Sequence, residues 1–388
     1  MQFSSIFFAK FSALVPTKAS DKVVMFKVKV HGCGSIGNHL ANASRALGWS
    51  VDMCDIDQAA LERTKHDIYP SRYGKWDEEI GLYNSKEVPI GGYDIIVIGT
   101  PPDVHIPLAM SAIAEKPKAI IVEKPICGPG LEGAQELVAE AKKQGVAIFT
   151  GYDHVVGRAS EEFVANINED KFGPLLTLDV EFREHWAGIF GAHPWLSGPE
   201  DTYLGYFRRG GGASGEHSHA ANLWQHFAHS AGKGRVSKVT AQLDFVKDGA
   251  IDYDRLCIMT LETDTGFTGR VVQDVITHPA RKWARAQFRD GSLEWQCGSK
   301  PGTDSVSEFK TDGYTRKTDI AKTRPDDFIK ELRHIEKALT ADPSMSPISL
   351  ERGLDTMMVV AAAHLSAATQ KTVSIDWTKG YVPSALSA

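Results

Sequence analysis

Apolar runs alternate with amphipathic stretches between residues 26 and 150. The apolar runs predict strands at 26–31, 50–55, 94–100, 119–123 and 146–150, and the amphipathic stretches predict helices at 36–47, 58–66, 104–114 and 131–143. The run at 94–100 is almost wholly apolar, which is typical of a parallel strand buried on both faces. Strands that alternate with helices in this way predict a doubly wound parallel sheet in an α/β domain.

The pattern changes after residue 151. Apolar and polar residues alternate with a period of two at 175–183, 237–245, 256–263, 268–274 and 284–295, and residues 263–266 and 289–291 suit hairpin turns. Two further helices are expected at 326–339 and 350–368. These features predict a C-terminal α+β domain with an open, mostly antiparallel sheet. We therefore divide the chain into an extension (1–24), an α/β domain (25–152) and an α+β domain (153–388).

The composition is that of an ordinary globular protein. Of the 388 residues, 42% are hydrophobic and 24% are charged, which excludes a disordered chain, a collagen and a coiled coil. The formal net charge is -6, so no strongly basic balance points to nucleic acid or to an anionic membrane. No apolar run approaches the ~20 residues that a membrane span needs.

Cysteine usage and the first residues bear on location. The five cysteines are scattered and form no C-x-x-C pair, so we expect neither a disulfide framework nor a zinc site, and a reducing, cytoplasmic compartment is favoured. Residues 1–24 are fairly apolar, but Lys10 interrupts them and no basic segment precedes them, unlike a secretory signal. We interpret them as an extension upstream of Met25, with a targeting peptide as the alternative.

A glycine-rich loop follows the first predicted strand. Residues 31–37 read His-Gly-Cys-Gly-Ser-Ile-Gly, a G-x-G-x-x-G pattern that lies between a strand and a helix, as a dinucleotide-binding Rossmann fold requires. In that fold, Gly32 permits the tight turn, Gly34 lets the backbone approach a pyrophosphate, and Gly37 lets helix and strand pack closely. The alternative is a structural glycine turn that binds no nucleotide.

The surroundings of this loop indicate which dinucleotide binds. Ser35 and Ile36 open the helix, whose N-terminal N–H groups would face the phosphates. Asp55 ends the second strand, where a carboxylate can accept hydrogen bonds from both ribose hydroxyls and would repel a 2′-phosphate. The sequence therefore predicts NAD as the cofactor, with NADP less favoured.

Three further segments resemble the glucose–fructose oxidoreductase, inositol dehydrogenase and MocA (Gfo/Idh/MocA) family. The first segment contains Thr100, Pro101 and His105 and resembles the family's fourth-strand segment beside the nicotinamide ribose. The second is Glu123-Lys124-Pro125, which matches the family's E-K-P signature. The third is Gly210-Gly211-Gly212, followed by Glu216 and His219, which resembles the family's entry to a catalytic helix. The resemblance covers residues 25 to about 375 in the family order. It implies a Rossmann domain, a substrate-binding and oligomerisation domain, NAD(P) chemistry on sugars or polyols, and homodimers or homotetramers.

Lys124 and His219 are the expected proton-transfer residues, with Glu216 beside them. Lys124 follows a buried strand at the edge where ligands of open α/β sheets bind, although a purely structural pair with Glu123 is the alternative. With Ser214 as its N-cap, a helix over 213–222 would place Glu216 and His219 on one face, so that Glu216 could orient His219.

The catalytic helix departs from the family pattern Asp-x-x-x-His-x-x-Asp. His219 and Asn222 keep the second interval, but Gly215 occupies the first acid position. When the glycines are aligned instead, Glu216 takes that position and His219 comes one residue early. His219 is therefore the firmer assignment, and a histidine satisfied within the core is the alternative for both His219 and His217.

The substrate is expected to meet residues from several segments. Aromatic side chains stack on sugar rings and arginine binds carboxylate or phosphate, so the segment between residues 186 and 212 is expected to shape a pocket for a sugar, including an acidic or nucleotide-linked one. The expected contacts are Tyr152, His154, Trp186, Arg208, Arg209, His217 and Asn222. Burial of these aromatic side chains under the loop, or at a subunit interface, is the alternative.

Six histidines fall between residues 185 and 229, and histidine is a common metal ligand. His217, His219, Glu216 and His226 form a conceivable ligand set, but His217 and His219 lie on different faces if they are helical. No metal ion is therefore expected.

The sequence thus predicts an NAD-dependent oxidoreductase that transfers hydride between the nicotinamide and a hydroxyl carbon of a sugar, polyol or sugar derivative. One alternative is transient oxidation of a sugar in a glycosidase, epimerase or dehydratase. A second is a non-catalytic NAD(P)-binding sensor, against which the presence of Lys124 and His219 argues. The expected partner is a small carbohydrate, not nucleic acid or a membrane.

Overall fold

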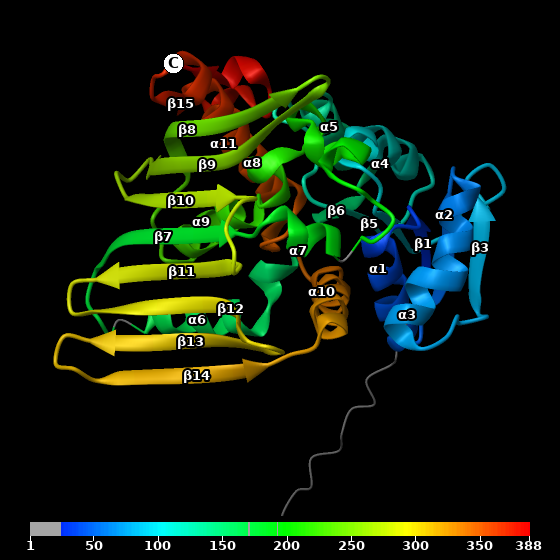
Figure 1. The fold of residues 1–388 in the computed structure, drawn as a ribbon, viewed down its shortest axis with the longest axis horizontal. Coiled ribbons are helices and arrows are strands. Elements are labelled where there is room, and N and C mark those ends of the chain that lie inside the picture. Colours follow the sequence, from blue (N-terminus) through cyan, green and yellow to red (C-terminus); the bar gives the residue numbers. More distant parts are fainter. Residues whose placement is uncertain (1–24, 170, 192) are drawn as a thin grey trace, which may run out of the picture.

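The computed structural model describes residues 25–169, 171–191 and 193–388. The expected extension at 1–24 lies outside these described residues. Two sheets lie side by side, and helix α10 (Arg324–Ala338) stands between them (Figure 1).

The N-terminal sheet is six-stranded and parallel, in the order β3-β2-β1-β4-β5-β6. Its strands are β1 (Lys27–His31), β2 (Ser50–Asp55), β3 (Ile80–Asn84), β4 (Ile95–Ile98), β5 (Ala119–Val122) and β6 (Ala147–Thr150). Its helices are α1 (Ser35–Ala46), α2 (Gln58–Arg63), α3 (Tyr69–Tyr73), α4 (His105–Ala114) and α5 (Ala134–Gln144). The β4 and β5 side chains are fully buried, as their unbroken apolar runs predict.

The C-terminal sheet has ten strands, in the order β14-β13-β12-β11-β7-β10-β9-β8-β15-β16. Its strands are β7 (Leu175–Arg183), β8 (Val236–Asp248), β9 (Ile251–Thr263), β10 (Thr268–Asp274), β11 (Arg281–Phe288), β12 (Gly291–Lys300), β13 (Thr303–Lys310), β14 (Thr315–Ala321), β15 (Val373–Ile375) and β16 (Leu386–Ser387). The pair β7–β10 is parallel and the other registered pairs are antiparallel, which confirms the expected mostly antiparallel sheet.

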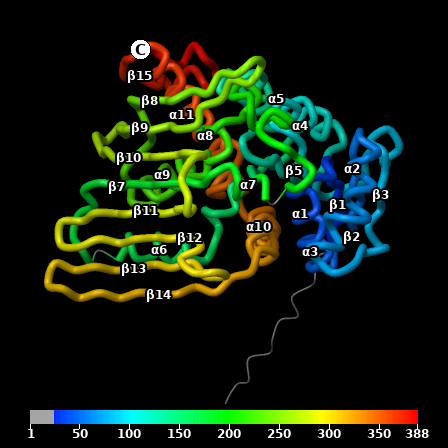
Figure 2. The backbone as a smooth tube through the Cα atoms, viewed as in Figure 1, coloured from blue at the N-terminus to red at the C-terminus, as the bar shows by residue number. Residues whose placement is uncertain are grey.

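Helices cover one face of this second sheet. They are α6 (Arg158–Asn168), α9 (His219–Ser230) and α11 (Leu350–Thr369), which lie behind the strands in the view of Figures 1 and 2. The short helices α7 (Trp186–Gly191) and α8 (Gly212–Glu216) lie at the end of the sheet that faces the first domain. The face toward the viewer carries no helix over most of its strands.

Three predicted elements needed correction. The predicted helix at 58–66 is the shorter α2, followed by a π-helical turn at Thr64–Ile68. The single strand expected at 284–295 is the hairpin β11–β12, whose turn at 289–291 was predicted. The segment between residues 186 and 212, which showed no regular pattern, contains α7 and three 3-10 turns.

The second domain contacts the carboxyl ends of the strands of the first sheet, where the candidate site lies. The Thr150 N–H donates to the Ile348 carbonyl at 2.8 Å, just before α11 begins. A Cβ at Gly353 would lie 2.2 Å from Thr150 Oγ1, so α11 needs glycine at this close approach to β6. Among the described residues, no helix is long and apolar enough to cross a membrane.

Candidate functional site

The glycine loop after β1 has the geometry that a dinucleotide requires. Gly32 has a φ of 98°, and a Cβ on it would lie 2.6 Å from the Gly99 carbonyl oxygen. A Cβ on Gly37 would lie 1.9 Å from the Gly32 oxygen, whereas a Cβ on Gly34 would meet nothing within 4 Å. Gly32 and Gly37 are therefore needed for packing inside the protein, and Gly34 borders the open space into which a pyrophosphate fits.

Asp55 lies directly against this loop. Its Oδ2 accepts a hydrogen bond from Cys33 N at 2.8 Å, and its Oδ1 accepts one from Asp57 N at 2.9 Å. These bonds fix the carboxylate while each oxygen keeps a lone pair for a ribose hydroxyl. At the start of α1, Ser35 is contacted by Arg72, whose Nη1 and Nη2 donate to the Ser35 oxygen and Oγ at 2.9 and 2.8 Å. Ile36 follows in the first turn of α1, and the N-terminus of α1 thus has an added positive charge, which suits a pyrophosphate.

The loops after β4 and β5 are tied together by His105. Its two ring nitrogens lie 2.7 Å from the Thr100 oxygen and 2.9 Å from the Pro125 oxygen, and its side chain is fully buried. His105 therefore fixes the position of the loop after β4, which is predicted to contact the cofactor. Pro101 is exposed on that loop, and Thr100 Oγ1 is buried without a partner in the described structure, which leaves it free for a ligand.

Lys124 reaches from the first domain to Glu216 in the second. Its Nζ donates to Glu216 Oε2 at 2.9 Å and to the Glu216 carbonyl at 3.0 Å. Tyr203 donates its hydroxyl to the same Oε2 at 3.3 Å. Burial raises the pKa of Tyr203 well above its ordinary value, and the charge of Glu216 raises it further, so this hydroxyl keeps its proton.

Glu216 carries the negative charge of this group. Burial by itself would raise its pKa, but Lys124 and then His217 more than offset that effect, and the pKa lies below its ordinary value. The side chains of Lys124 and Glu216 are only 13% and 19% exposed, so the ion pair is largely shielded from water. The predicted alternative, a pair of Lys124 with Glu123, is not what forms: Glu123 Oε2 accepts only the Lys124 backbone N–H, at 3.2 Å.

The contact between the two domains, where Lys124 meets Glu216, is called the junction below. His219 lies near it in a pocket of aromatic side chains. It stacks on Phe182 with ring centroids 5.9 Å apart, and the rings of Tyr152 and His154 meet it edge-on at 5.4 and 4.7 Å. Its Nδ1 lies 4.0 Å from Asp153 Oδ1. Burial lowers the pKa of His219 well below its ordinary value, and His154 lowers it further, so the imidazole is neutral near pH 7.

The expected helix over 213–222 is broken, which corrects two predictions. Helix α8 ends at Glu216 and α9 begins at His219, so Glu216 does not share a helical face with His219 and pairs with Lys124 instead. Ser214 is not an N-cap, because Gly211 occupies that position. The Ser214 hydroxyl lies 2.9 Å from His364 Nε2 and donates to the buried Asp254 at 3.0 Å.

The expected substrate residues of the aromatic segment divide into two groups. Trp186 donates from Nε1 to the Tyr253 hydroxyl at 3.2 Å and packs in a small apolar cluster with Ala213 and Val275, as the burial alternative proposed. Arg208 lies over the Phe207 ring, and Arg209 pairs with Asp103 of the first domain at 3.0 Å.

The segment that carries Arg208 and Arg209 packs against the loops that follow β4 and β5 in the first domain. Gly210 has a φ of 90°, and a Cβ there would lie 2.9 Å from Pro102 and 3.1 Å from Pro125. A Cβ on Gly128 would lie 2.2 Å from the Arg208 carbonyl oxygen. The two arginines therefore stand at the rim of the cofactor edge rather than deep within a sugar pocket.

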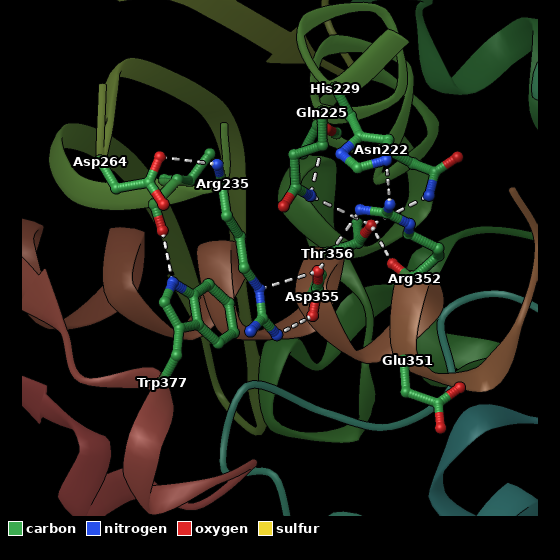
Figure 3. Close-up of polar contacts among 12 residues, drawn as sticks. Asn222, Gln225, His229, Arg235, Asp264, Glu351, Arg352, Asp355, Thr356 and Trp377 are labelled. Carbon is green, nitrogen blue, oxygen red and sulfur yellow. Dashed lines mark hydrogen bonds and ion pairs between the residues drawn. The ribbon is translucent and has the colours of Figure 1, made fainter. Parts of the chain in front are cut away.

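Asn222 and His217 were expected to contact the substrate, but their surroundings in the structure differ from that expectation. Asn222 turns toward α11, where its Nδ2 donates to Thr356 Oγ1 at 3.0 Å, and it lines a cavity of about 230 Å³ between α9 and α11 (Figure 3). His226 lines the same cavity and therefore lies apart from Glu216, His217 and His219, the other members of the ligand set considered for a metal ion. His217 is 3% exposed with Nε2 unpartnered among the described residues, and burial lowers its pKa to about 4.

Two residues of the site were not assigned from the sequence. Tyr203 was one of several aromatic residues in the segment after Trp186, and no spacing distinguished it. Asp153 stood between the assigned Tyr152 and His154, and an acidic residue directly after a parallel strand was the signal that could have identified it.

Comparison with known protein families supports the assignment of the first domain. Residues 26–152 match the model of the Gfo/Idh/MocA family, described as an oxidoreductase family with an NAD-binding Rossmann fold. No curated protein matches the sequence significantly.

Solved structures share the fold over most of the chain. An oxidoreductase from Agrobacterium radiobacter in complex with NAD+, L-tartaric acid and magnesium superimposes with a TM-score of 0.70 at 18% identity, covering 90% of this chain and 98% of its own. A levoglucosan dehydrogenase in complex with NADH gives 0.72 at 15%, covering 90% and 99%. The WlbA dehydrogenase from Bordetella pertussis, in complex with NADH and UDP-GlcNAcA, gives 0.68 at 18%, covering 91% and 99%.

These identities establish a shared fold, and the family match establishes the cofactor domain. The predicted NAD-binding Rossmann domain is thereby confirmed. With residues 26–152 the chain carries the NAD-binding Rossmann domain of the Gfo/Idh/MocA oxidoreductase family.

Proposed function

We propose that this protein is an NAD-dependent dehydrogenase that oxidises a hydroxyl-bearing carbon of a sugar, polyol or sugar derivative. The observation that carries the proposal is the Lys124–Glu216 pair at the junction, directly after β5. Ligands of open α/β sheets bind beyond the carboxyl ends of the strands, so a substrate here would lie against the nicotinamide end of the cofactor. NAD, when bound, supplies the hydride acceptor.

The remaining groups divide the proton chemistry between them. Lys124, held by Glu216, donates a hydrogen bond to the substrate oxygen and stabilises the negative charge that develops on it. The neutral imidazole of His219 accepts the hydroxyl proton. The buried rings of Phe182 and Tyr152 keep His219 oriented and keep water from it.

The substrate class rests on chemistry and on the fold relatives. The levoglucosan dehydrogenase and WlbA structures contain NADH, and the second also contains a nucleotide-linked sugar acid. The arginines at the rim, Arg208 and Arg209, suit a substrate with an acidic or phosphate group. The five cysteines all carry free thiols, which favours a cytoplasmic location for this activity.

The test uses Lys124→Met, which keeps the length of the side chain and removes its charge. With the best substrate from a panel of polyols, sugars and sugar acids, we expect kcat to fall about 100-fold or more, because a positioned proton-transfer group contributes roughly 10²–10⁴-fold. NAD affinity, measured by fluorescence, should stay within about threefold of the wild-type value. Wild-type kcat in Lys124→Met would contradict the proposed role.

A further inference from the structure

A buried carboxylate at the junction is held by loose ion pairs. The Asp153 side chain is 8% exposed, and its nearest charged neighbours are His219 Nδ1 at 4.0 Å and Arg324 Nη1 at 3.8 Å. Both contacts are loose ion pairs, longer than a hydrogen bond. A carboxylate has about four lone-pair positions, so the Asp153 oxygens can accept a further partner.

Two imidazoles share the space in front of Asp153. One atom from each of Asp153, His154 and His219 lies within 4.8 Å of the others. His219 Nδ1 is buried and has no hydrogen-bond partner in the described structure. A neutral imidazole binds a metal ion through its lone pair.

The carboxyl groups around this space are crowded. Burial raises the pKa of Glu331 well above its ordinary value, and the charges of Glu123 and Asp153 raise it further. Both carboxyl oxygens of Glu331 are buried without partners among the described residues. Glu331 therefore keeps its proton and adds no negative charge to this space.

The nearby cations already have carboxylate partners. Lys124 pairs with Glu216, and Lys322 pairs with Asp304 and Asp327. Arg324 is the exception, because it is 52% exposed and its contacts to Asp153 and Asp327 are 3.8 and 3.9 Å long. Arg324 is therefore the charge that would oppose an ion in this pocket.

We propose that Asp153, His154 and His219 bind a divalent transition-metal ion, with further coordination positions open toward the substrate pocket. Two imidazoles and one carboxylate suit Zn²⁺, Co²⁺ or Fe²⁺, and all three residues lie at the carboxyl edge of the first sheet or at the start of α9. With metal–ligand distances near 2.1 Å, the ligand atoms would close to about 3.3 Å apart, which small side-chain rotations achieve.

One consequence rests on the proposed function. His219 uses its lone pair either to hold the ion or to accept the substrate proton, and it cannot do both at once. Occupancy of the metal site is thus expected to inhibit the dehydrogenase, with Zn²⁺ competing against the substrate and not against NAD.

Metal binding is tested without any turnover. The full chain, treated with a chelator and dialysed, is titrated with Co²⁺, whose visible absorption intensifies in a tetrahedral or five-coordinate nitrogen–oxygen site. We expect one Co²⁺ per chain, with affinity at least about tenfold weaker in Asp153→Asn and in His154→Gln, since ligand loss removes a direct bond. Arg324→Gln should bind Co²⁺ more tightly than the wild type, because it removes the opposing charge.

The control is His226→Asn, which changes a histidine about 10 Å further along α9 and should leave Co²⁺ binding unchanged. Thermal unfolding and NAD binding confirm that each variant is folded. Co²⁺ binding by the wild type no tighter than by Asp153→Asn would overturn the metal site, whether or not the dehydrogenase proposal holds. Tight Co²⁺ binding together with an active enzyme that Zn²⁺ does not inhibit would overturn the inhibitory consequence.

Discussion

The ion pair between Lys124 and Glu216 is the residue-scale feature that matters most for chemistry. If Glu216 fixes the position of Lys124 Nζ, then Glu216→Gln loses the charged partner while it keeps the shape of the side chain. We expect kcat to fall by about 10- to 100-fold, since a misplaced catalytic group costs about that much. The measurement is steady-state kinetics together with the Kd for NAD, which should be unchanged.

A matched control for Glu216→Gln is available on the surface. Glu262 pairs with Lys238 at 2.8 Å, but both side chains are well exposed. Glu262→Gln should leave kcat and stability almost unaltered, because exposed ion pairs contribute little. Equal kcat in both variants would show that Glu216 has no positioning role.

Asp55 is expected to determine which dinucleotide is used. Its carboxylate is fixed by Cys33 N and Asp57 N beside the glycine loop. Asp55→Ser should raise the KM for NAD by about 10- to 100-fold, since hydrogen bonds to a charged group contribute roughly 1.5–3 kcal/mol. It should also lower the KM for NADP by relieving repulsion. Asp57→Ser, two residues away at the N-cap of α2, is the control and should keep the preference for NAD.

The structure brings the predicted cofactor residues together more completely than the predicted substrate residues. The loop at Gly32–Gly37 and the Lys124 segment depend on local backbone geometry, which residue spacing encodes. The contacts of Tyr203 with Glu216, and of Asp153 with His219, join segments 13 and 66 residues apart, so no local pattern reveals them. Arg208 and Asn222 have suitable chemistry for sugar binding, but tertiary packing turns one to the rim and the other toward α11.

At the scale of elements, the alternation of apolar and polar residues predicts interior strands well and edge strands poorly. β7 and β10 have the predicted bounds, because each has a face buried under helices. β13 and β14 were not predicted, since their sequences are rich in Thr, Ser, Lys and Asp, and β14 is an exposed edge strand. The break between α8 and α9 also escaped prediction, because Asp254 and His364, far along the chain, hold α8 in place.

The contact between α1 and α10 makes stability depend on pH. His39 on α1 stacks on Phe328 of α10 with centroids 4.8 Å apart, and burial lowers the pKa of His39 from 6.5 to about 3. Between these values the unfolded chain binds a proton that the folded chain does not, so this contribution to stability is present above pH 6.5 and is lost as the pH falls.

His39→Gln isolates this effect. Relative to the variant, the wild type should lose free energy of unfolding by up to about 1.4 kcal/mol per pH unit as the pH is lowered from about 6.5. Urea unfolding of both proteins at about pH 7 and about pH 5 gives the difference. A difference that does not change with pH would show that His39 titrates equally in both states. His66→Gln, at an exposed histidine on the π-helical turn outside this contact, is the control for the loss of a histidine side chain.

For the whole molecule, the uncovered face of the ten-stranded sheet bears on assembly. Among the described residues, α6, α9 and α11 cover one face (Figure 1), and the apolar side chain of Ile258, between the buried Cys257 and Met259 of β9, is 38% exposed. An open sheet face of this size favours association with a second copy. We expect a homodimer or homotetramer by size-exclusion chromatography with light scattering. A monomer at all concentrations would contradict this expectation, and Ile258→Lys should shift an assembled protein toward monomer.

The central claim for the whole molecule is that the junction of the two domains oxidises a sugar-type hydroxyl with NAD. It is tested most directly by nicotinamide absorbance, with purified wild-type protein, NAD or NADP, and a panel of polyols, sugars, sugar acids and nucleotide-linked sugars. We expect net NADH formation with one substrate class, at a higher kcat/KM with NAD than with NADP. Bound NAD with no net reduction by any member of the panel, even where product analysis shows that the sugar has changed, would contradict the claim.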